Sequence, residues 1–176
     1  ANVWSGTWRV AFSGPVVPPT PWPRAAPGAT APATQRIRAT NWRSLQESPL
    51  DDSPPSVTYV DLNGDGYEEA VWTDAEGIED SGSGWYSSVE VYSMLPGDTV
   101  PRHVQTIGGQ IDDNSDGQVS LVSASRRGVV VARAEFSEDD ARCCPHADRI
   151  EQWRWNGQWL EEDVVRRRVV PRRPVP

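Results

Sequence analysis

Residues 57–73 read VTYVDLNGDGYEEAVWT and contain two predicted strands around an acidic loop. Val57 to Val60 and Glu69 to Thr73 are rich in β-branched and aromatic residues, which favour a pleated backbone. The intervening loop contains glycine and several oxygen-bearing side chains, both typical of tight turns. This stretch therefore predicts two strands joined by a chemically distinctive turn.

The same kind of pattern continues toward the C-terminus. Further candidate strands are residues 85–92, 102–107, 119–125, 128–136, 149–155 and 158–165. A hairpin is expected across Arg126-Arg127, and another across Asn156-Gly157, whose residues tolerate the positive φ angles of a type I′ turn. No window of helix length shows 3.6-residue periodicity. We therefore predict an all-β fold of mostly antiparallel sheet, sandwich- or partial-barrel-like, with long proline-rich loops and extended termini.

The two ends of the chain differ from this body. Residues 3–12 and 35–42 are predicted to be strands that pair with each other, and the seven prolines of residues 13–34 predict an arm or surface loop. Three parts are expected. They are residues 1–56, N-terminal strands with a proline-rich arm; residues 57–165, the β-rich domain; and residues 166–176, a basic tail in extended conformation.

Charge is distributed unevenly along the 176 residues, whose net charge is -8. The first 46 residues carry five arginines and no acid, whereas residues 47–140 carry 20 acids and four arginines. The last 36 residues carry eight arginines and five acids. This balance argues against a uniformly basic nucleic-acid binder, and no apolar run is long enough to span a bilayer. The arginine-bearing ends instead suggest docking to a protein partner, and also leave association with a membrane surface open.

The loop that begins at Asp61 has the most specific chemistry of the chain. Ca²⁺ prefers six to eight hard oxygen ligands in flexible geometry, and oxygen donors at alternate loop positions can surround one point. Gly66 permits the sharp turn, while Trp72 stands where an EF-hand has its closing glutamate, so this is not an EF-hand. The alternative is a metal-free turn in which side chains accept hydrogen bonds from backbone amides. The expected calcium ligands are Asp61, Asn63, Asp65, Tyr67 through its carbonyl, and Glu69.

A second acidic stretch, residues 112–117, repeats the first half of this spacing. Its ninth position is Ser120, which is a weak ligand for Ca²⁺. An exposed acidic turn is therefore preferred there over a second calcium site.

The two cysteines, Cys143 and Cys144, are adjacent and followed by Pro145. Adjacent cysteines can form only a strained ring, a vicinal disulfide, and such a bond persists in oxidising compartments. Reduced or separately paired thiols are the alternative, and a zinc or copper site is disfavoured because vicinal cysteines point poorly for tetrahedral ligation. The chain begins Ala1-Asn2-Val3, as removal of a signal peptide or anchor would leave it, and as an arbitrary boundary would too. We expect an extracytoplasmic protein, whether secreted, periplasmic or at the cell surface.

No catalytic motif is found in the sequence. His103 and His146 lie outside any recognisable nucleophile motif, and no phosphate-binding glycine loop is present. Trp153 and Trp155 share a strand face near Trp159, which is explained by core packing or by an exposed aromatic platform for sugar or protein.

Three motifs in order resemble an uncharacterised family of secreted bacterial proteins and lipoproteins. They are the Asp-x-Asn-Gly-Asp-Gly loop at residues 61–66, the segment Gly-Ser-Gly-Trp-Tyr at residues 82–86, and Cys-Cys-Pro at residues 143–145. The resemblance spans residues 57–163 and departs at His146, where a polar Thr or Ser is usual. It implies export and a β-rich fold, but no activity.

These observations favour a non-enzymatic exported accessory or structural protein, a calcium-stabilised subunit of a larger extracytoplasmic or membrane-associated assembly. A glycan- or cell-wall-binding module that uses the tryptophans is the first alternative. A small hydrolase that depends on carboxylates is the second.

Overall fold

The structure is a computed structural model of the chain. It describes residues 21–24, 34–46, 55–77, 85–108, 118–137, 140, 144–164 and 168–172. The predicted strand at residues 3–12 and the acidic stretch at residues 112–117 lie outside these ranges. Within the described part, no helix is long and apolar enough to cross a membrane.

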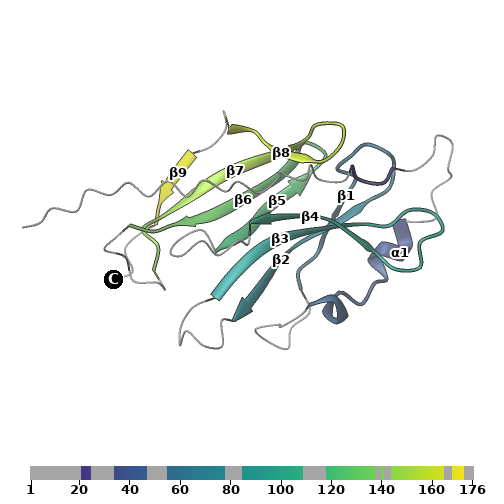
Figure 1. Ribbon diagram of the computed structural model, residues 1–176, viewed down its shortest axis with the longest axis horizontal. Helices are drawn as coiled ribbons and strands as arrows, with labels where there is room; N and C mark the ends of the chain where they lie inside the picture. The colour runs from purple at the N-terminus through teal and green to yellow at the C-terminus, as the bar shows by residue number, and fades with distance from the viewer. Residues whose placement is uncertain are drawn as a thin grey trace, which may run out of the picture.

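Two antiparallel sheets form the body of the molecule, which confirms the predicted all-β fold (Figure 1). Sheet A has the order β1-β2-β3-β4, and sheet B has the order β5-β6-β7-β8, with β9 also paired to β7. The strands of sheet A are β1 (Thr58–Val60), β2 (Glu69–Gly77), β3 (Trp85–Ser93) and β4 (Arg102–Gly108). Those of sheet B are β5 (Val119–Ser125), β6 (Gly128–Glu135), β7 (Ala147–Trp155), β8 (Leu160–Glu162) and β9 (Arg168–Pro171).

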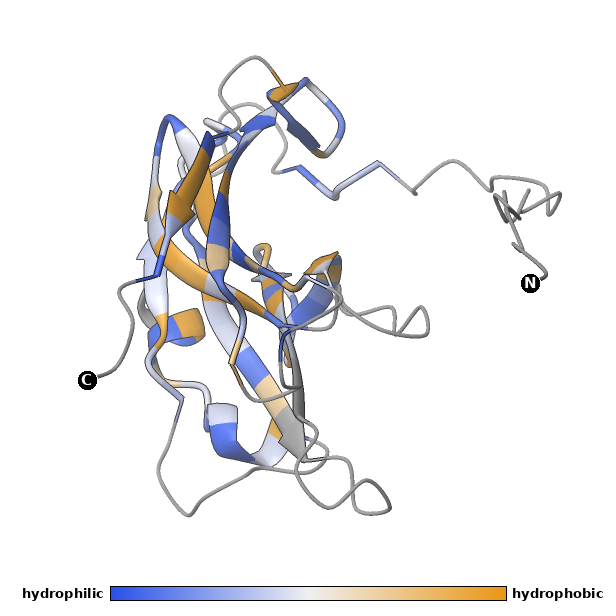
Figure 2. Cartoon of the chain, turned by 90° about the vertical axis from the view of Figure 1, so that its left-hand side faces the viewer, coloured by the Kyte–Doolittle hydropathy of each residue, from blue (hydrophilic) through white to orange (hydrophobic). Residues whose placement is uncertain are grey.

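The main hydrophobic core lies between the two sheets because alternate residues of each strand point inward. Val71, Val89 and Ile107 of sheet A pack in one cluster with Val129 and Val131 of sheet B. Apolar residues accordingly recur along the strands of both sheets (Figure 2). The sheets therefore pack face to face as a sandwich, and the described strands do not close into a barrel.

A second core covers the outer face of sheet A. Helix α1 (Thr34–Arg38) and the 3₁₀ helix η1 (Trp42–Leu45) bring Ile37 and Trp42 onto Trp72 and Ala70. The Trp42 and Trp72 ring centroids lie 4.7 Å apart, and the Trp42 indole donates a hydrogen bond to the Tyr59 hydroxyl at 2.7 Å. The prediction of a strand at residues 35–42 was wrong, because these residues cover the sheet as short helices rather than extend it.

The two predicted hairpins are present, with one difference in turn geometry. Strands β5 and β6 pair across Arg126-Arg127, and β7 pairs with β8 across residues 156–159. Gly157 has a φ of 107°, but Asn156 does not have positive φ. A type I′ turn was therefore the wrong expectation. The Asn156 side chain instead accepts hydrogen bonds from the backbone amides of Gln158 and Trp159, at 2.9 and 3.1 Å.

Described residues from the N-terminal proline-rich segment and from the basic tail both pack into the sandwich. Trp22 is buried, and its backbone amide donates a hydrogen bond to the Gln158 carbonyl at 2.9 Å. At the other end, residues 168–171 form β9, antiparallel to residues 147–150 of β7. This part of the basic tail therefore has the extended backbone that its sequence predicts, and it pairs into sheet B. That strand completes sheet B because β8 pairs with only the last three residues of β7.

Candidate functional site

The acidic loop begins directly after β1 and ends at the first residue of β2. Asp61 organises it, because its two carboxylate oxygens accept hydrogen bonds from the backbone amides of Gly64 and Gly66, at 2.8 and 3.2 Å. Gly64 and Gly66 have φ angles of 74° and 89°, in the region that L-residues with side chains rarely occupy. The two glycines thus allow the chain to curl around the Asp61 carboxylate.

The next oxygen-bearing side chains repeat this arrangement on a smaller scale. The Asn63 side-chain oxygen accepts a hydrogen bond from the Asp65 amide at 2.9 Å, and an Asp65 oxygen accepts one from the Tyr67 amide at 3.0 Å. Each is an Asx turn, in which a side chain bonds the backbone two residues ahead. The local sequence therefore closes the loop through short-range hydrogen bonds, as the metal-free alternative requires.

Glu69 closes the loop from the sandwich side, and its side chain is wholly buried. Its carboxylate accepts hydrogen bonds from the Leu62 amide at 2.8 Å, the Asn63 side-chain amide at 3.2 Å and the Ser93 hydroxyl at 3.5 Å. Burial raises the pKa of Glu69 to about 8; the Leu62 hydrogen bond opposes this rise, and the Asp65 and Asp61 charges add to it. The loop therefore concentrates negative charge around a buried carboxyl group.

The donor chemistry of this loop suits Ca²⁺, because every predicted ligand supplies a hard oxygen. The carboxylates are turned toward backbone amides, however, and the described residues contain no group of three or more His, Cys, Asp or Glu side chains arranged to hold a metal ion. Binding Ca²⁺ would require Asp61, Asp65 and Glu69 to move closer together. Calcium ligation by Asp61, Asn63, Asp65, Tyr67 and Glu69 thus stays a prediction.

A polar cluster that sequence reasoning did not identify lies on the outer face of sheet A. Glu90 of β3 lies 2.7 Å from the His103 ring nitrogen Nε2 of β4, and it accepts hydrogen bonds from Ser88 and Thr106, at 2.5 and 2.8 Å. Burial raises the pKa of Glu90, but the hydrogen bonds from His103, Ser88 and Thr106 outweigh burial and lower it overall. Strand alternation places Ser88 and Glu90 on one face, whereas only the register of β3 with β4 brings His103 beside them.

The order of contacts in this cluster differs from that of a hydrolase triad. In a triad the imidazole stands between the nucleophilic hydroxyl and the carboxylate, so that it takes the hydroxyl proton. Here the Glu90 carboxylate stands between the Ser88 hydroxyl and the His103 ring. Ser88 therefore donates its hydrogen bond to a carboxylate, which is a weak base, and this arrangement does not activate it as a nucleophile.

The three tryptophans of the predicted platform are partly buried against the inter-sheet core. Trp155 contacts Trp22, with ring centroids 5.0 Å apart, and the Trp153 indole donates a hydrogen bond to Glu151 at 3.3 Å. Trp159 follows the hairpin turn and packs against the same cluster. Core packing accounts for the positions of these rings, and their use as a ligand platform stays a prediction.

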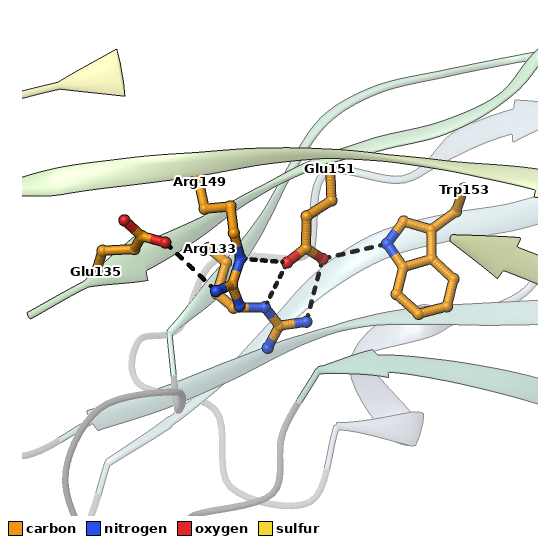
Figure 3. A network of polar contacts seen from close by, with 5 residues as sticks. All are labelled: Arg133, Glu135, Arg149, Glu151 and Trp153. Carbon is orange, nitrogen blue, oxygen red and sulfur yellow. Dashed lines mark hydrogen bonds and ion pairs between the residues drawn. The ribbon is translucent and has the colours of Figure 1, made fainter. Parts of the chain in front are cut away.

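A charged network extends the inner face of sheet B beyond the apolar core (Figure 3). Glu151, 1% exposed, accepts hydrogen bonds from Arg133 at 2.8 and 3.2 Å and from Arg149 at 2.9 Å. Arg149 also reaches Glu135 at 3.3 Å. Burial raises the pKa of Glu151, but hydrogen bonds and charge from Arg133, with help from Arg149 and Trp153, lower it overall. Two arginines and two glutamates balance in charge, so this network is a structural feature rather than an anion site.

The segment that leads into β7 contains the predicted vicinal disulfide. Asp140 accepts hydrogen bonds from the backbone amides of Ser137 and His146, at 2.7 and 3.2 Å, and lies 2.8 Å from the His146 ring nitrogen Nδ1. These bonds, the Ser137 amide foremost, lower the pKa of Asp140 to about 2. Cys144 is not a free thiol, but Cys143 lies outside the described residues. The bond between the two therefore stays a prediction.

One open hollow of about 490 Å³ lies between the helical cover and the turn that joins β3 to β4. Asp98 is the only acidic residue among the described residues that line it, and this side chain pairs with Arg102. None of the loop residues 61–69 lines this hollow, so it does not join the buried acid of Glu69 to a substrate-sized cavity.

Comparisons with known proteins provide no identity. The chain matches no family model, no curated protein and no solved structure.

Proposed function

We propose that the protein is a non-enzymatic accessory module of an extracytoplasmic assembly, whose loop 61–69 takes up Ca²⁺ to stabilise the sandwich. The observation that carries the calcium part is the wholly buried Glu69 carboxylate at the ninth loop position, within the field of Asp61 and Asp65. A divalent cation would neutralise the charge of Asp61 and Asp65 and stabilise ionised Glu69, once these side chains close around it. The export part is supported by the adjacent cysteines.

The role as a binding module is supported by how the polar residues are arranged. The Ser88–Glu90–His103 contacts lack the order that activates a nucleophile, and the carboxylates of the acidic loop engage backbone amides. The described residues instead form a two-sheet sandwich, in which Trp22 joins the core and β9 joins sheet B. Such a body presents surfaces and sheet edges to a partner.

Thermal melts in chelator and in CaCl₂ test the calcium part. A cation that binds only the folded protein stabilises it by about 2.7 kcal/mol when its concentration is 100 times the dissociation constant, so the melting temperature should rise with calcium. Glu69→Gln should lose most of this rise, because it removes the closing carboxylate. Glu161→Gln, which changes an exposed acid of β8, is the matched control and should keep it.

Calorimetric titration with CaCl₂ provides the second readout. One ion per chain should bind the unchanged protein and the Glu161→Gln variant. If neither the melting temperature nor the titration responds to calcium, the calcium proposal is contradicted. The loop side chains would then serve only to accept hydrogen bonds from backbone amides. Stabilisation that Glu69→Gln retains would place the ion elsewhere.

A further inference from the structure

Strand β9 forms an outer edge of sheet B, and among the described strands it pairs with β7 alone (Figure 1). Arg172 fixes the end of this strand in two ways. Its backbone amide donates a hydrogen bond to the His146 carbonyl at 2.9 Å, and its guanidinium contacts the Asp148 carboxylate at 2.6 and 3.0 Å. The edge is therefore attached to the body by backbone and side-chain contacts.

The register shows which backbone groups of β9 face outward. In an antiparallel pair, residues that exchange hydrogen bonds alternate with residues whose N–H and C=O groups point away from the partner strand. Because Arg172 bonds opposite His146, Val170 and Arg168 also bond toward β7, opposite Asp148 and Ile150. Val169 therefore directs both its N–H and its C=O outward.

The two valines of β9 are exposed, and the sequence around this strand is rich in arginine. Val169 and Val170 are 53% and 42% exposed. The sequence from residue 166 to residue 173 contains five arginines and no acid. A segment with this much positive charge repels a second copy of itself, since like charges brought together by strand pairing destabilise the pair. The same charges attract a strand that carries acids.

We propose that the outer edge of β9 binds an extended acidic segment of a partner protein, which adds a strand to sheet B. The outward N–H and C=O of Val169 supply the central pair of backbone hydrogen bonds. The exposed valines contact apolar side chains of the added strand, and Arg168 attracts its acids. Pro171 has no N–H, so it offers only its carbonyl and limits pairing at that end.

This inference rests on the proposed role as an assembly module and names the chemistry of the partner. It does not involve loop 61–69, which lies between β1 and β2 of sheet A. The calcium proposal and the strand-addition proposal can therefore be contradicted separately, because calcium-dependent stabilisation is measured without any peptide.

Binding of a synthetic peptide that alternates glutamate and threonine, measured by fluorescence anisotropy with the full chain, tests the proposal. Val169→Pro removes the outward N–H without removing a hydrogen bond to β7, and should weaken binding by about tenfold, as loss of hydrogen bonds worth roughly 1.4 kcal/mol would do. Val169→Thr keeps the N–H and is the matched control. Arg168→Gln should weaken binding and reduce its dependence on salt.

Melting curves of all three variants check that β9 and the sandwich remain folded. Slowed amide exchange at Val169 on addition of the peptide would place the added strand at this edge. Equal binding of a peptide that alternates lysine and threonine would overturn the proposal, as would full affinity of Val169→Pro. Two other results would also overturn it, namely concentration-dependent self-association that Val169→Pro abolishes, and binding restricted to anionic lipid vesicles.

Discussion

The Trp22 ring lies against that of Trp155, with ring centroids 5.0 Å apart and planes inclined by 47°. Trp22 belongs to a proline-rich segment far from β7 in the sequence, yet its side chain is only 4% exposed and joins the inter-sheet core. The described part of that segment is therefore a component of the fold.

Replacing Trp22 by alanine should lower the free energy of unfolding by about 3–5 kcal/mol, because it removes a large buried ring and leaves a cavity. Trp22→Phe should cost less, since the Trp22 indole nitrogen has no hydrogen-bond partner to lose. Urea denaturation measures both changes. Val164→Ala, at a side chain that is 65% exposed, is the control and should change stability by less than about 0.5 kcal/mol. A Trp22→Ala variant as stable as this control would contradict the packing of residues 21–24.

Gly128 is the position where sheet B tolerates no side chain. A Cβ atom there would lie 1.9 Å from the Trp153 carbonyl oxygen, and the residue has a φ of 119°. Gly128→Ala should therefore destabilise the protein severely, by more than about 3 kcal/mol, since backbone strain and a steric clash add. Gly97→Ala is the matched control, because Gly97 also has positive φ but open space around it. Its cost should be about 1 kcal/mol, and equal losses in thermal melts would contradict this account.

Glu151 should stabilise the sandwich at neutral pH. Glu151→Ala leaves Arg133 and Arg149 without their shared carboxylate, so we expect a loss of roughly 3 kcal/mol. Because its pKa is lowered in the folded protein, this contribution is present above the unfolded value of about 4.5 and is lost as pH falls through the folded pKa. Urea denaturation across the acid range should show the two proteins converging at low pH. A constant difference at every pH would contradict the ionic part of the contribution.

Glu69 should have the opposite effect on the pH dependence of stability, measured with chelator present. Its folded pKa of about 8 lies above its ordinary value of 4.5, so the folded state binds more protons between these values. Its contribution to stability should therefore fall as pH rises from about 4.5 to 8, by a few kcal/mol in all, and level off above that. Glu69→Gln should remove this slope, whereas Glu161→Gln should retain it. An unchanged slope in Glu69→Gln would show that other groups cause it.

The sequence was sufficient to predict most strands, because their signals are local. The strands around residues 57–73 and the hairpin across Arg126-Arg127 follow from side-chain alternation and from residues that favour turns. Residues 35–42 were misassigned because a few alternating residues also fit a single helical turn. Trp72 and Ala70 leave an apolar outer face on sheet A, and a short helical cover with Ile37 and Trp42 buries it.

The basic tail is a second case in which local sequence predicts the backbone but not its partner. Its arginines and prolines predict extended backbone, which is correct for residues 168–171. They do not predict which strand these residues pair with. β7 is nine residues long and β8 covers three of them, so Ala147 to Ile150 have open backbone groups that β9 fills. Such pairing depends on the lengths of neighbouring strands, which the tail itself does not encode.

The sequence by itself determined the strand order along the chain, the glycine-dependent curl of loop 61–69 and the uneven distribution of charge, since each depends on neighbouring residues. Only the tertiary structure decided that Glu69 is buried, that Glu90 meets His103, and that β9 leaves Val169 on an open edge. Burial and cross-strand contact depend on which distant segments pack together. They result from maximal removal of apolar surface from water and from pairing of backbone groups, which no local pattern specifies.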